Sequence, residues 1–240
     1  MALALAAVLA LWELLPGAGA VNPVLFPPLS KVVATFFELM VKGALAKATV
    51  VTLYRTVVAL AAGFAAGVAF AALMVSLRPV RWLFEPLFSL TYPMPKIALI
   101  PIFVLWFGIG DMAKVLLAAL TAFYPIMLST AAAARGIRQS LHWSAQSLGA
   151  GRAAMIWKVV LPASIPGAMT GLQVAAPLTI IVVVVSEMTS SGGGLGNMLT
   201  VASRNFEMGV QFAVLFTLML IGVGFDRLIV LARKAVLRWE

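Results

Sequence analysis

Two charged residues stand out because the chain around them is apolar. Lys96 lies in the run TYPMPKIALIP, and Glu187 directly follows the uncharged run 159–186. An ammonium near the middle of a membrane helix costs about 2.5–3.5 kcal/mol unless water, a partner or a nearby interface satisfies it. We therefore expect Lys96 either to line a path for an anion or to be satisfied by backbone carbonyls where the prolines break the helix.

The neighbours of Lys96 are assigned to the same path. Met94 and Pro95 precede it directly, and Glu187 is assigned to the outer end of the path. A carboxylate at a membrane interface needs no function, so that reading of Glu187 stays open. Aromatic side chains that could also line the path, with core packing as the alternative, are Phe103, Trp106, Phe107 and Tyr124.

Residues suited to other chemistry are few. The chain has no cysteine and one histidine, His142, and no two carboxylates share an apolar run. Thiol catalysis, thiolate metal sites and histidine-rich metal sites are therefore excluded. The glycine run 192–194 is not followed by Lys-Ser or Lys-Thr, so it does not match a nucleotide-binding loop. We expect no catalytic residue and no metal site on this chain.

The composition places the whole chain in a lipid bilayer. Its 240 residues are 63% hydrophobic and 10% charged, and its mean hydropathy is +1.08. Soluble domains carry about 25% charged residues, so this chain lacks the polar surface that water requires. We predict an all-α, polytopic membrane protein that forms a single transmembrane domain over residues 1–240.

Four segments have the length and composition of membrane spans. About 20 apolar residues are needed to cross the hydrocarbon core of a bilayer. Each of the four is free of charged residues, and together they are 56–77, 115–134, 159–186 and 208–225.

Two further segments bring the expected number to about six transmembrane helices. Residues 82–107 are apolar but contain Glu85, Lys96 and four prolines, so we predict a broken or kinked span there. The N-terminal run from Ala2 to Trp12 predicts a short or incomplete span. A signal peptide ending near residues 18–20 is the alternative, although no Lys or Arg precedes Lys31 to form its basic region.

The basic residues predict the orientation. The formal charge is +9, and the positive-inside rule favours the arrangement that puts most cations in the cytoplasm. With both termini inside, the cytoplasmic cations include Arg78, Arg81, Arg135, Arg233 and Lys234. The basic character therefore reflects membrane topology, and it does not indicate nucleic-acid binding.

Two connecting segments carry recognisable patterns. The external segment 16–50 is expected to contain an amphipathic surface helix with Ser30 as its N-cap. The loop 136–160 is expected to form a short helix from Ser140 to Leu148, a glycine turn at 149–151, and a second helix that Pro162 bends toward the membrane. Small side chains on the first helix would let it enter a groove on another protein.

Small residues recur every four positions along the predicted span 56–77. Ala59, Gly63, Gly67 and Ala71 allow a close approach between helices. This stripe predicts packing within the chain, and a seam between two copies is the alternative.

The loop 136–160 resembles a known family signature. Gly149 is followed after nine residues by Val159-Val160-Leu161-Pro162, which is similar to the EAA signature of ABC importer permeases. Further similarity, in the runs PMPKIALIPIFVLWFGIGD, GLQVA and GGLGNML, indicates the nitrate, sulfonate and taurine branch. The chain departs from the signature where Trp143 replaces its glutamate and Ser144 its first alanine.

This resemblance implies the type I ABC importer permease fold, a transport function and a location in a bacterial inner membrane. The 136–160 loop would be the coupling helix region, and the residues that it would present to the ATPase are Leu141, Trp143, Ser144, Ala145, Leu148, Gly149, Ala150, Leu161 and Pro162. The implied partners are a cytoplasmic ABC ATPase dimer, an external substrate-binding protein, a second permease copy and membrane lipid. ATP and magnesium would bind to the ATPase, so no cofactor and no enzyme activity are expected on this chain. The solute would be a small anion such as nitrate, a sulfonate, taurine or a similar organic acid.

Two other functions are alternatives to an importer permease. A channel or secondary transporter would work without an ATPase, and it is the main alternative although no repeated halves are evident. An intramembrane enzyme would need a nucleophile, a base or metal ligands at bilayer depth. The sequence offers none of these.

Overall fold

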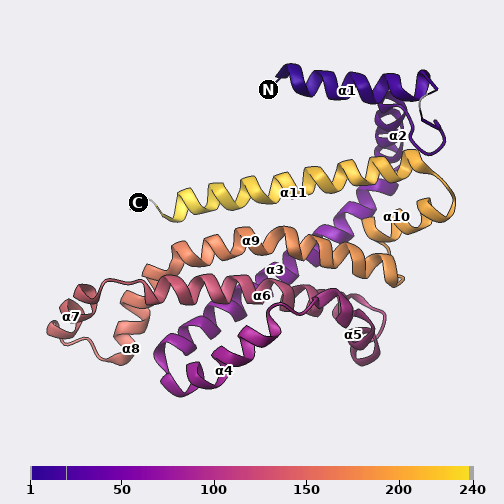
Figure 1. Cartoon of the computed structure of the whole chain (residues 1–240). Helices are drawn as coiled ribbons and strands as arrows, with labels where there is room; N and C mark the ends of the chain where they lie inside the picture. Colours follow the sequence, from indigo (N-terminus) through magenta and orange to yellow (C-terminus); the bar gives the residue numbers. More distant parts are fainter. Residues whose placement is uncertain (1, 20, 238–240) are drawn as a thin grey trace. The chain divides into compact units, whose positions relative to one another are not determined.

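The computed structural model describes residues 2–19 and 21–237, and it is helical throughout its regular parts (Figure 1). Residue 20, in the stretch weighed as a cleavage site, lies outside the described residues. No strand occurs within the described ranges. The helices are α1 Ala2–Gly17, α2 Leu29–Val41, α3 Ala44–Ser76, α4 Arg78–Thr91, α5 Ile100–Phe107, α6 Asp111–Arg135, α7 Gln139–Ser147, α8 Arg152–Met155, α9 Leu161–Thr189, α10 Leu195–Arg204 and α11 Met208–Val236, with a 3-10 turn at Lys96–Leu99 and a π-helical turn at Ile156–Val160.

The predicted all-α membrane fold is confirmed. Among the described residues, four helices are long and apolar enough to cross a membrane: Ala44–Ser76, Asp111–Arg135, Ile156–Thr189 and Met208–Val236. Each contains one of the four uncharged runs almost entirely. The apolar helix α1 is shorter than these four, as its sequence predicted.

The fifth candidate span is broken, as its prolines predicted. The segments Arg78–Thr91 and Lys96–Phe107 meet at an angle of 95° and together pass the same test as the four long helices. Pro93 and Pro95 lie in the gap between them, where a proline removes a backbone N–H and limits the preceding residue to extended conformations.

The chain forms two compact units, which are described separately. The first comprises Met1–Tyr54 and Val184–Ile221, and the second Arg55–Val183 and Gly222–Glu240. In the first unit, Leu45, Leu195 and Val214 form a buried apolar core. In the second, Leu60, Ala122 and Ile126 pack with residues of α9 and α11.

The start of α2 corrects one expectation. Ser30 is not the N-cap, because the helix begins at Leu29 and Pro28 holds the cap position. The backbone N–H and the hydroxyl of Ser30 instead donate to the carboxylate of Glu13, at 2.9 and 2.7 Å. A side chain from α1 therefore satisfies a free N–H of the first turn, which is the work that a local cap would otherwise do.

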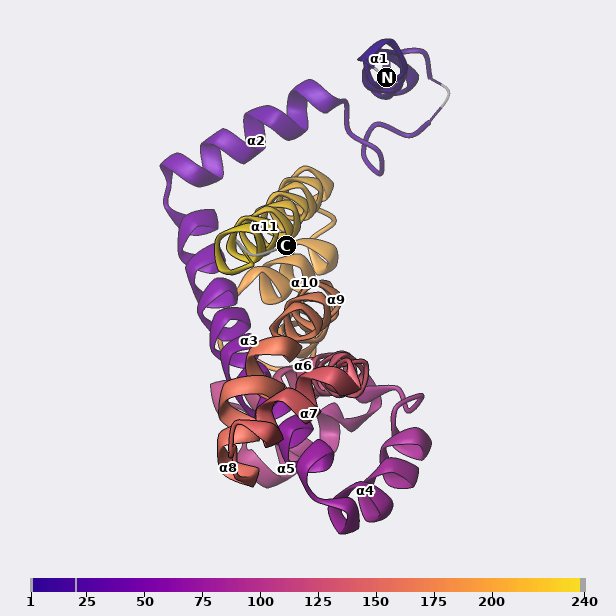
Figure 2. The ribbon, with the colours of Figure 1, turned by 90° about the vertical axis from the view of Figure 1, so that its left-hand side faces the viewer.

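Glycines on α3 and α9 bring both helices against α6 in the second unit. A Cβ atom at Gly63 of α3 would lie 2.6 Å from the Cβ of Ala122, and one at Gly171 of α9 would lie 2.6 Å from the Cα of Ile126. Figure 2 views α6 and α9 nearly end-on, side by side. The stripe that includes Gly63 thus packs within the chain, which is the first of the two readings given above.

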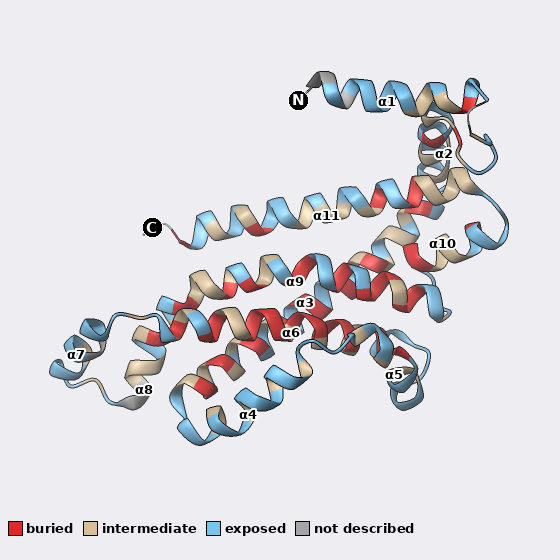
Figure 3. Ribbon diagram, viewed as in Figure 1, coloured by how far each residue is buried: buried red, intermediate tan, exposed pale blue. Residues whose placement is uncertain are grey.

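Burial follows this packing. The ribbon of α6 is largely buried, whereas that of α7 is largely exposed (Figure 3). Since α6 contacts helices on two sides, its small side chains are removed from solvent. The helix α7, in contrast, leaves most of its side chains in contact with solvent.

Candidate functional site

The helix α7 ends in a motif that requires glycine. The N–H of Ala150 donates to the carbonyl of Ala145, and the N–H of Gly149 donates to that of Gln146, each at 2.9 Å. These are the two hydrogen bonds of a Schellman motif, in which the residue after the C-cap adopts a left-handed conformation. Gly149 does so, with φ +76°. The signature glycine is therefore the residue that ends α7 and redirects the chain.

The surface of α7 carries large apolar side chains in contact with solvent. Leu141 is 50% exposed, Trp143 62% and Leu148 88%. Ser144 and Gly149 are also exposed, and Ala145 is half-buried. Exposed apolar side chains grouped on one short helix are typical of a surface that binds another protein. By helical spacing, Leu141, Ala145 and Leu148 share one side of this segment, and Trp143 lies toward the opposite side.

The return from α7 to the membrane passes through an irregular helix. After α8 the chain forms the π-helical turn Ile156–Val160 and then enters α9 at Leu161. Pro162 has no N–H to donate to the carbonyl four residues earlier, so the regular α-helical pattern cannot continue through this point. Leu161 is half-buried and Pro162 exposed, and Figure 1 shows the chain changing direction between α8 and α9.

Lys96 lies at the break between α4 and α5. Its ammonium donates to the carbonyl oxygen of Thr91, at 3.4 Å, and to that of Tyr92. It also lies 4.5 Å from the ring centroid of Tyr124 and 5.2 Å from that of Tyr92, within the range of cation–π contacts. The carbonyls at the broken helix therefore do satisfy this lysine, which was one of its two expected roles.

A cavity of about 340 Å³ opens beside Lys96 in the second unit. Pro95 and Lys96 line it, together with Tyr92, Tyr124 and the aliphatic side chains of α9. Met94 is not among its lining residues and is 44% exposed. Of the aromatic residues considered for the path, Tyr124 lines this cavity, whereas Phe103, Trp106 and Phe107 are not among its lining residues.

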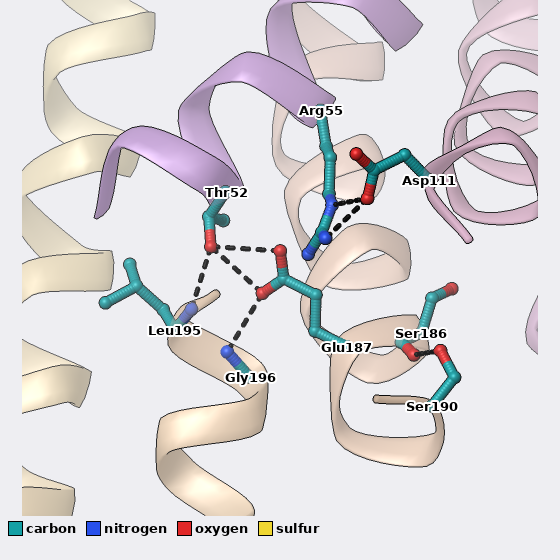
Figure 4. Close-up of polar contacts among 8 residues, drawn as sticks. All are labelled: Thr52, Arg55, Asp111, Ser186, Glu187, Ser190, Leu195 and Gly196. Atoms are coloured by element: carbon teal, nitrogen blue, oxygen red, sulfur yellow. Dashed lines mark hydrogen bonds and ion pairs between the residues drawn. The ribbon is translucent and has the colours of Figure 1, made fainter. Parts of the chain in front are cut away.

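Glu187 belongs to the first unit, where it is fully buried. Its carboxylate accepts hydrogen bonds from the hydroxyl of Thr52 and, at 3.0 Å, from the N–H of Gly196 (Figure 4). Thr52 in turn accepts from the N–H of Leu195 at 2.9 Å. The end of α9, the start of α10 and the first turns of α3 are joined through this one carboxylate.

The glycine run is shaped by the same carboxylate. Gly194 has φ +99°, and a Cβ atom there would overlap the carboxylate of Glu187. A Cβ atom at Gly196 would overlap the carbonyl oxygen of Val184. At Gly194, the absence of a side chain therefore lets the backbone of this run approach Glu187.

An ion pair at the start of α6 was also not predicted from the sequence. In the second unit, Arg55 donates through Nε and Nη2 to Oδ1 of Asp111, at 2.9 and 2.5 Å (Figure 4). The Arg55 side chain is 2% exposed and that of Asp111 is 55% exposed. Pairing with Asp111 offsets part of the cost of burying the guanidinium.

The structure combines three features. Its long helices are apolar enough to cross a membrane, its broken span holds a cation beside a cavity, and its exposed helix α7 ends at a glycine. Together these features indicate a membrane transport protein. The chain belongs to the family described as binding-protein-dependent transport system inner membrane component, which it matches over residues 59–238. It is a permease subunit of an ABC importer, as the resemblance of the 136–160 loop implied.

Curated relatives agree with this assignment. The chain is 28% identical to the putative aliphatic sulfonates transport permease SsuC of Bacillus subtilis, over 98% of this chain and 85% of that protein. It is 30% identical to the taurine transport permease TauC of Escherichia coli, over 87% of this chain and 78% of that protein. The nitrate, sulfonate and taurine branch is therefore supported.

A solved structure supports the fold. An inward-facing form of the MetNI methionine ABC transporter contains a chain that matches with a TM-score of 0.70 at 20% identity, covering 82% of this chain and 97% of that one. The family is a transport component and not an enzyme family, and membership in this family of ABC importer permeases implies a substrate-binding protein and an ATPase as partners.

Proposed function

We propose that the chain forms one half of a permease pair that passes a small anion from an external binding protein to the cytoplasm. Both termini and α7 lie on the cytoplasmic side, and the surrounding partner is membrane lipid. ATP and magnesium bind to a separate ATPase dimer. The two permease copies alternate between inward-facing and outward-facing forms as the ATPase subunits close and open.

The observation that carries this proposal is the exposure of large apolar side chains around α7. Leu141, Trp143 and Leu148 would be costly to leave in water, and they bury their surface when α7 docks in a groove of the ATPase. Ala145 and Ser144 are small enough to allow close contact there. Ala150, Leu161 and Pro162 set the direction of the chain after α7, so a movement of the ATPase reaches α9 through them.

Trp143, which replaces the glutamate of the family signature, lies toward the other side of α7 from Leu141 and Leu148. Its indole ring is 62% exposed and offers a large apolar area, which suits the centre of an interface. We therefore expect docking to depend on buried area at this point instead of an ion pair. Under this proposal Trp143→Ala weakens docking. Trp143→Glu weakens it as well, although it introduces the residue of the family signature.

The test reconstitutes the chain with its ATPase and binding protein in proteoliposomes. Release of phosphate is measured with the binding protein unloaded and loaded with nitrate, alkanesulfonates, aromatic carboxylates or a neutral heterocycle. We expect stimulation by anions, and a loss of at least about tenfold in Trp143→Ala, as for a central interface residue. Gln139→Ala, an exposed polar change on the same helix, serves as the matched control.

Other outcomes have defined meanings. Solute uptake that continues without any ATPase subunit would favour a channel or secondary transporter and would overturn the proposal. Stimulation by neutral solutes alone would leave the permease pair in place and remove the assignment of an anion.

A further inference from the structure

The cavity beside Lys96 combines a cation with aromatic and aliphatic walls. Tyr92, Lys96 and Ile97 come from the broken span, and Thr121, Tyr124 and Pro125 from α6. The remaining lining residues are Leu178, Ile181 and Val182 of α9. Three separate segments of the second unit thus converge on one ammonium.

The size of the cavity fits a small organic molecule. Its volume of about 340 Å³ lies at the lower end of the range of about 300–1,000 Å³ that is usual for small-molecule sites. Such sites are mostly apolar with a few polar groups that fix the orientation of the ligand. Lys96 is the one formally charged residue among the lining residues of this cavity.

The ammonium can still serve a ligand. It has three N–H donors, and the carbonyls of Thr91 and Tyr92 accept from two of them. The cation lies over the face of Tyr124, whose hydroxyl donates to Oγ1 of Thr91 at 2.9 Å. This hydrogen bond fixes the ring, so the ring and the ammonium form a preset surface.

We propose that this cavity binds an organic anion, whose acidic group pairs with Lys96 and whose apolar part lies against Tyr124 and the aliphatic side chains of α9. The proposal rests on the proposed function, because it places one station of the anion's path in this cavity. The range of anions that this cavity would bind is narrower than the range given in the proposed function. An aromatic and aliphatic wall favours sulfonates or carboxylates that carry a hydrocarbon group, whereas nitrate gains nothing from such a wall.

Direct binding tests the proposal on the purified full chain in lipid nanodiscs. The probes are benzenesulfonate, butanesulfonate, nitrate and the neutral benzenesulfonamide, measured by saturation-transfer NMR and calorimetry. We expect both sulfonates to bind. The neutral sulfonamide lacks the charge that pairs with Lys96, and nitrate lacks the apolar part that lies against the wall, so each should bind at least about tenfold more weakly.

Variants separate the roles of charge and ring. Lys96→Met should weaken sulfonate binding at least about tenfold, while Lys96→Arg retains most of it. Tyr124→Leu should weaken benzenesulfonate binding, and Tyr124→Phe, which keeps the ring, should weaken it less. Lys47→Met removes a lysine of the first unit and should leave binding unchanged.

The outcomes distinguish this site from the proposed function. Equal binding of sulfonates by the wild-type chain and Lys96→Met would overturn the site, even if ATP-driven uptake continues. Absence of sulfonate binding to the wild-type chain would also overturn it. Sulfonate binding that depends on Lys96, in a chain whose uptake needs no ATPase, would support the site and contradict the proposed function.

Discussion

The hydroxyl of Thr52 lies 2.9 and 3.1 Å from the two carboxylate oxygens of Glu187. The two residues are 135 positions apart in the chain and both are fully buried. A buried carboxylate is costly unless donors surround it, so this contact and the N–H of Gly196 make the position of Glu187 tolerable. The carboxylate joins helices, and this role does not require contact with a solute.

Replacing Thr52 tests this role. Thr52→Val keeps the shape but removes a donor to Glu187 and the acceptor for the N–H of Leu195, so we expect the free energy of unfolding to fall by about 2 kcal/mol or more. Thermal unfolding in detergent, followed by circular dichroism, measures the change. Thr49→Val is the control, because the buried Thr49 hydroxyl has no hydrogen-bond partner in the part of the chain described. Equal losses in both variants would contradict the assignment.

Gly196 should tolerate no side chain. Gly196→Ala places a Cβ atom against the carbonyl oxygen of Val184, and backbone atoms cannot move aside as a flexible side chain would. We expect destabilisation of about 1–3 kcal/mol, as for overpacked cores. Gly222→Ala in α11 enters open space and should be neutral or stabilising by up to about 1 kcal/mol. Similar melting temperatures for the two variants would show that the close approach is relaxed in solution.

The contact between α9 and α6 gives a matched test in the second unit. Gly171→Ala would bring a Cβ atom to 2.6 Å from the Cα of Ile126 and 2.8 Å from the carbonyl oxygen of Pro125. We expect a loss of about 1–3 kcal/mol, with helix separation visible as increased hydrogen exchange in α6. Gly224→Ala, which meets nothing within 4 Å, should leave exchange in α6 unchanged.

Two ion pairs of the second unit, Arg55 with Asp111 and Arg135 with Glu85, should differ in their contribution to stability. Removing a partner from a fully buried pair costs about 3–5 kcal/mol, whereas an exposed pair contributes about 0–1 kcal/mol. Asp111→Asn leaves a buried guanidinium facing a neutral side chain, and since Asp111 is itself 55% exposed we expect an intermediate loss of about 1–2 kcal/mol.

Glu85→Gln is the comparison for Asp111→Asn, and the free energy of unfolding of both variants is measured as for Thr52→Val. The pair of Glu85 with Arg135 spans 2.8 Å, and both side chains are about half exposed. Its loss should cost at most about 0.5 kcal/mol and should shrink further in high salt. A larger effect for Glu85 than for Asp111 would reverse the ranking that burial predicts.

The spans were predictable because the bilayer imposes a simple rule. A helix in hydrocarbon needs about 20 apolar residues, so the uncharged runs marked α3, α6, α9 and α11 directly. The prolines around Lys96 marked the break for an equally local reason. The end of α7 was predictable because Gly149 provides the left-handed conformation that its hydrogen bonds require.

Contacts between distant residues were not predictable in this way. Nothing near Ser30 indicates that Glu13 would satisfy its N–H, because the partner comes from another helix. Thr52 likewise gives no sign that it meets Glu187. One signal was available: three consecutive glycines indicate positive φ or a close approach, and a neighbouring carboxylate is a natural object for such an approach.

The glycine contacts on both sides of α6 affect how movement spreads through the second unit. With Gly63 on one side and Gly171 on the other, backbones touch directly, and no flexible side chains lie between them to absorb a displacement. The core segments of α3, α6 and α9 must then tilt as one stiff block. Because α6 leads into the 136–160 loop and α9 leaves it, the docking proposed for α7 would turn this block as a lever, without loss in local rearrangement.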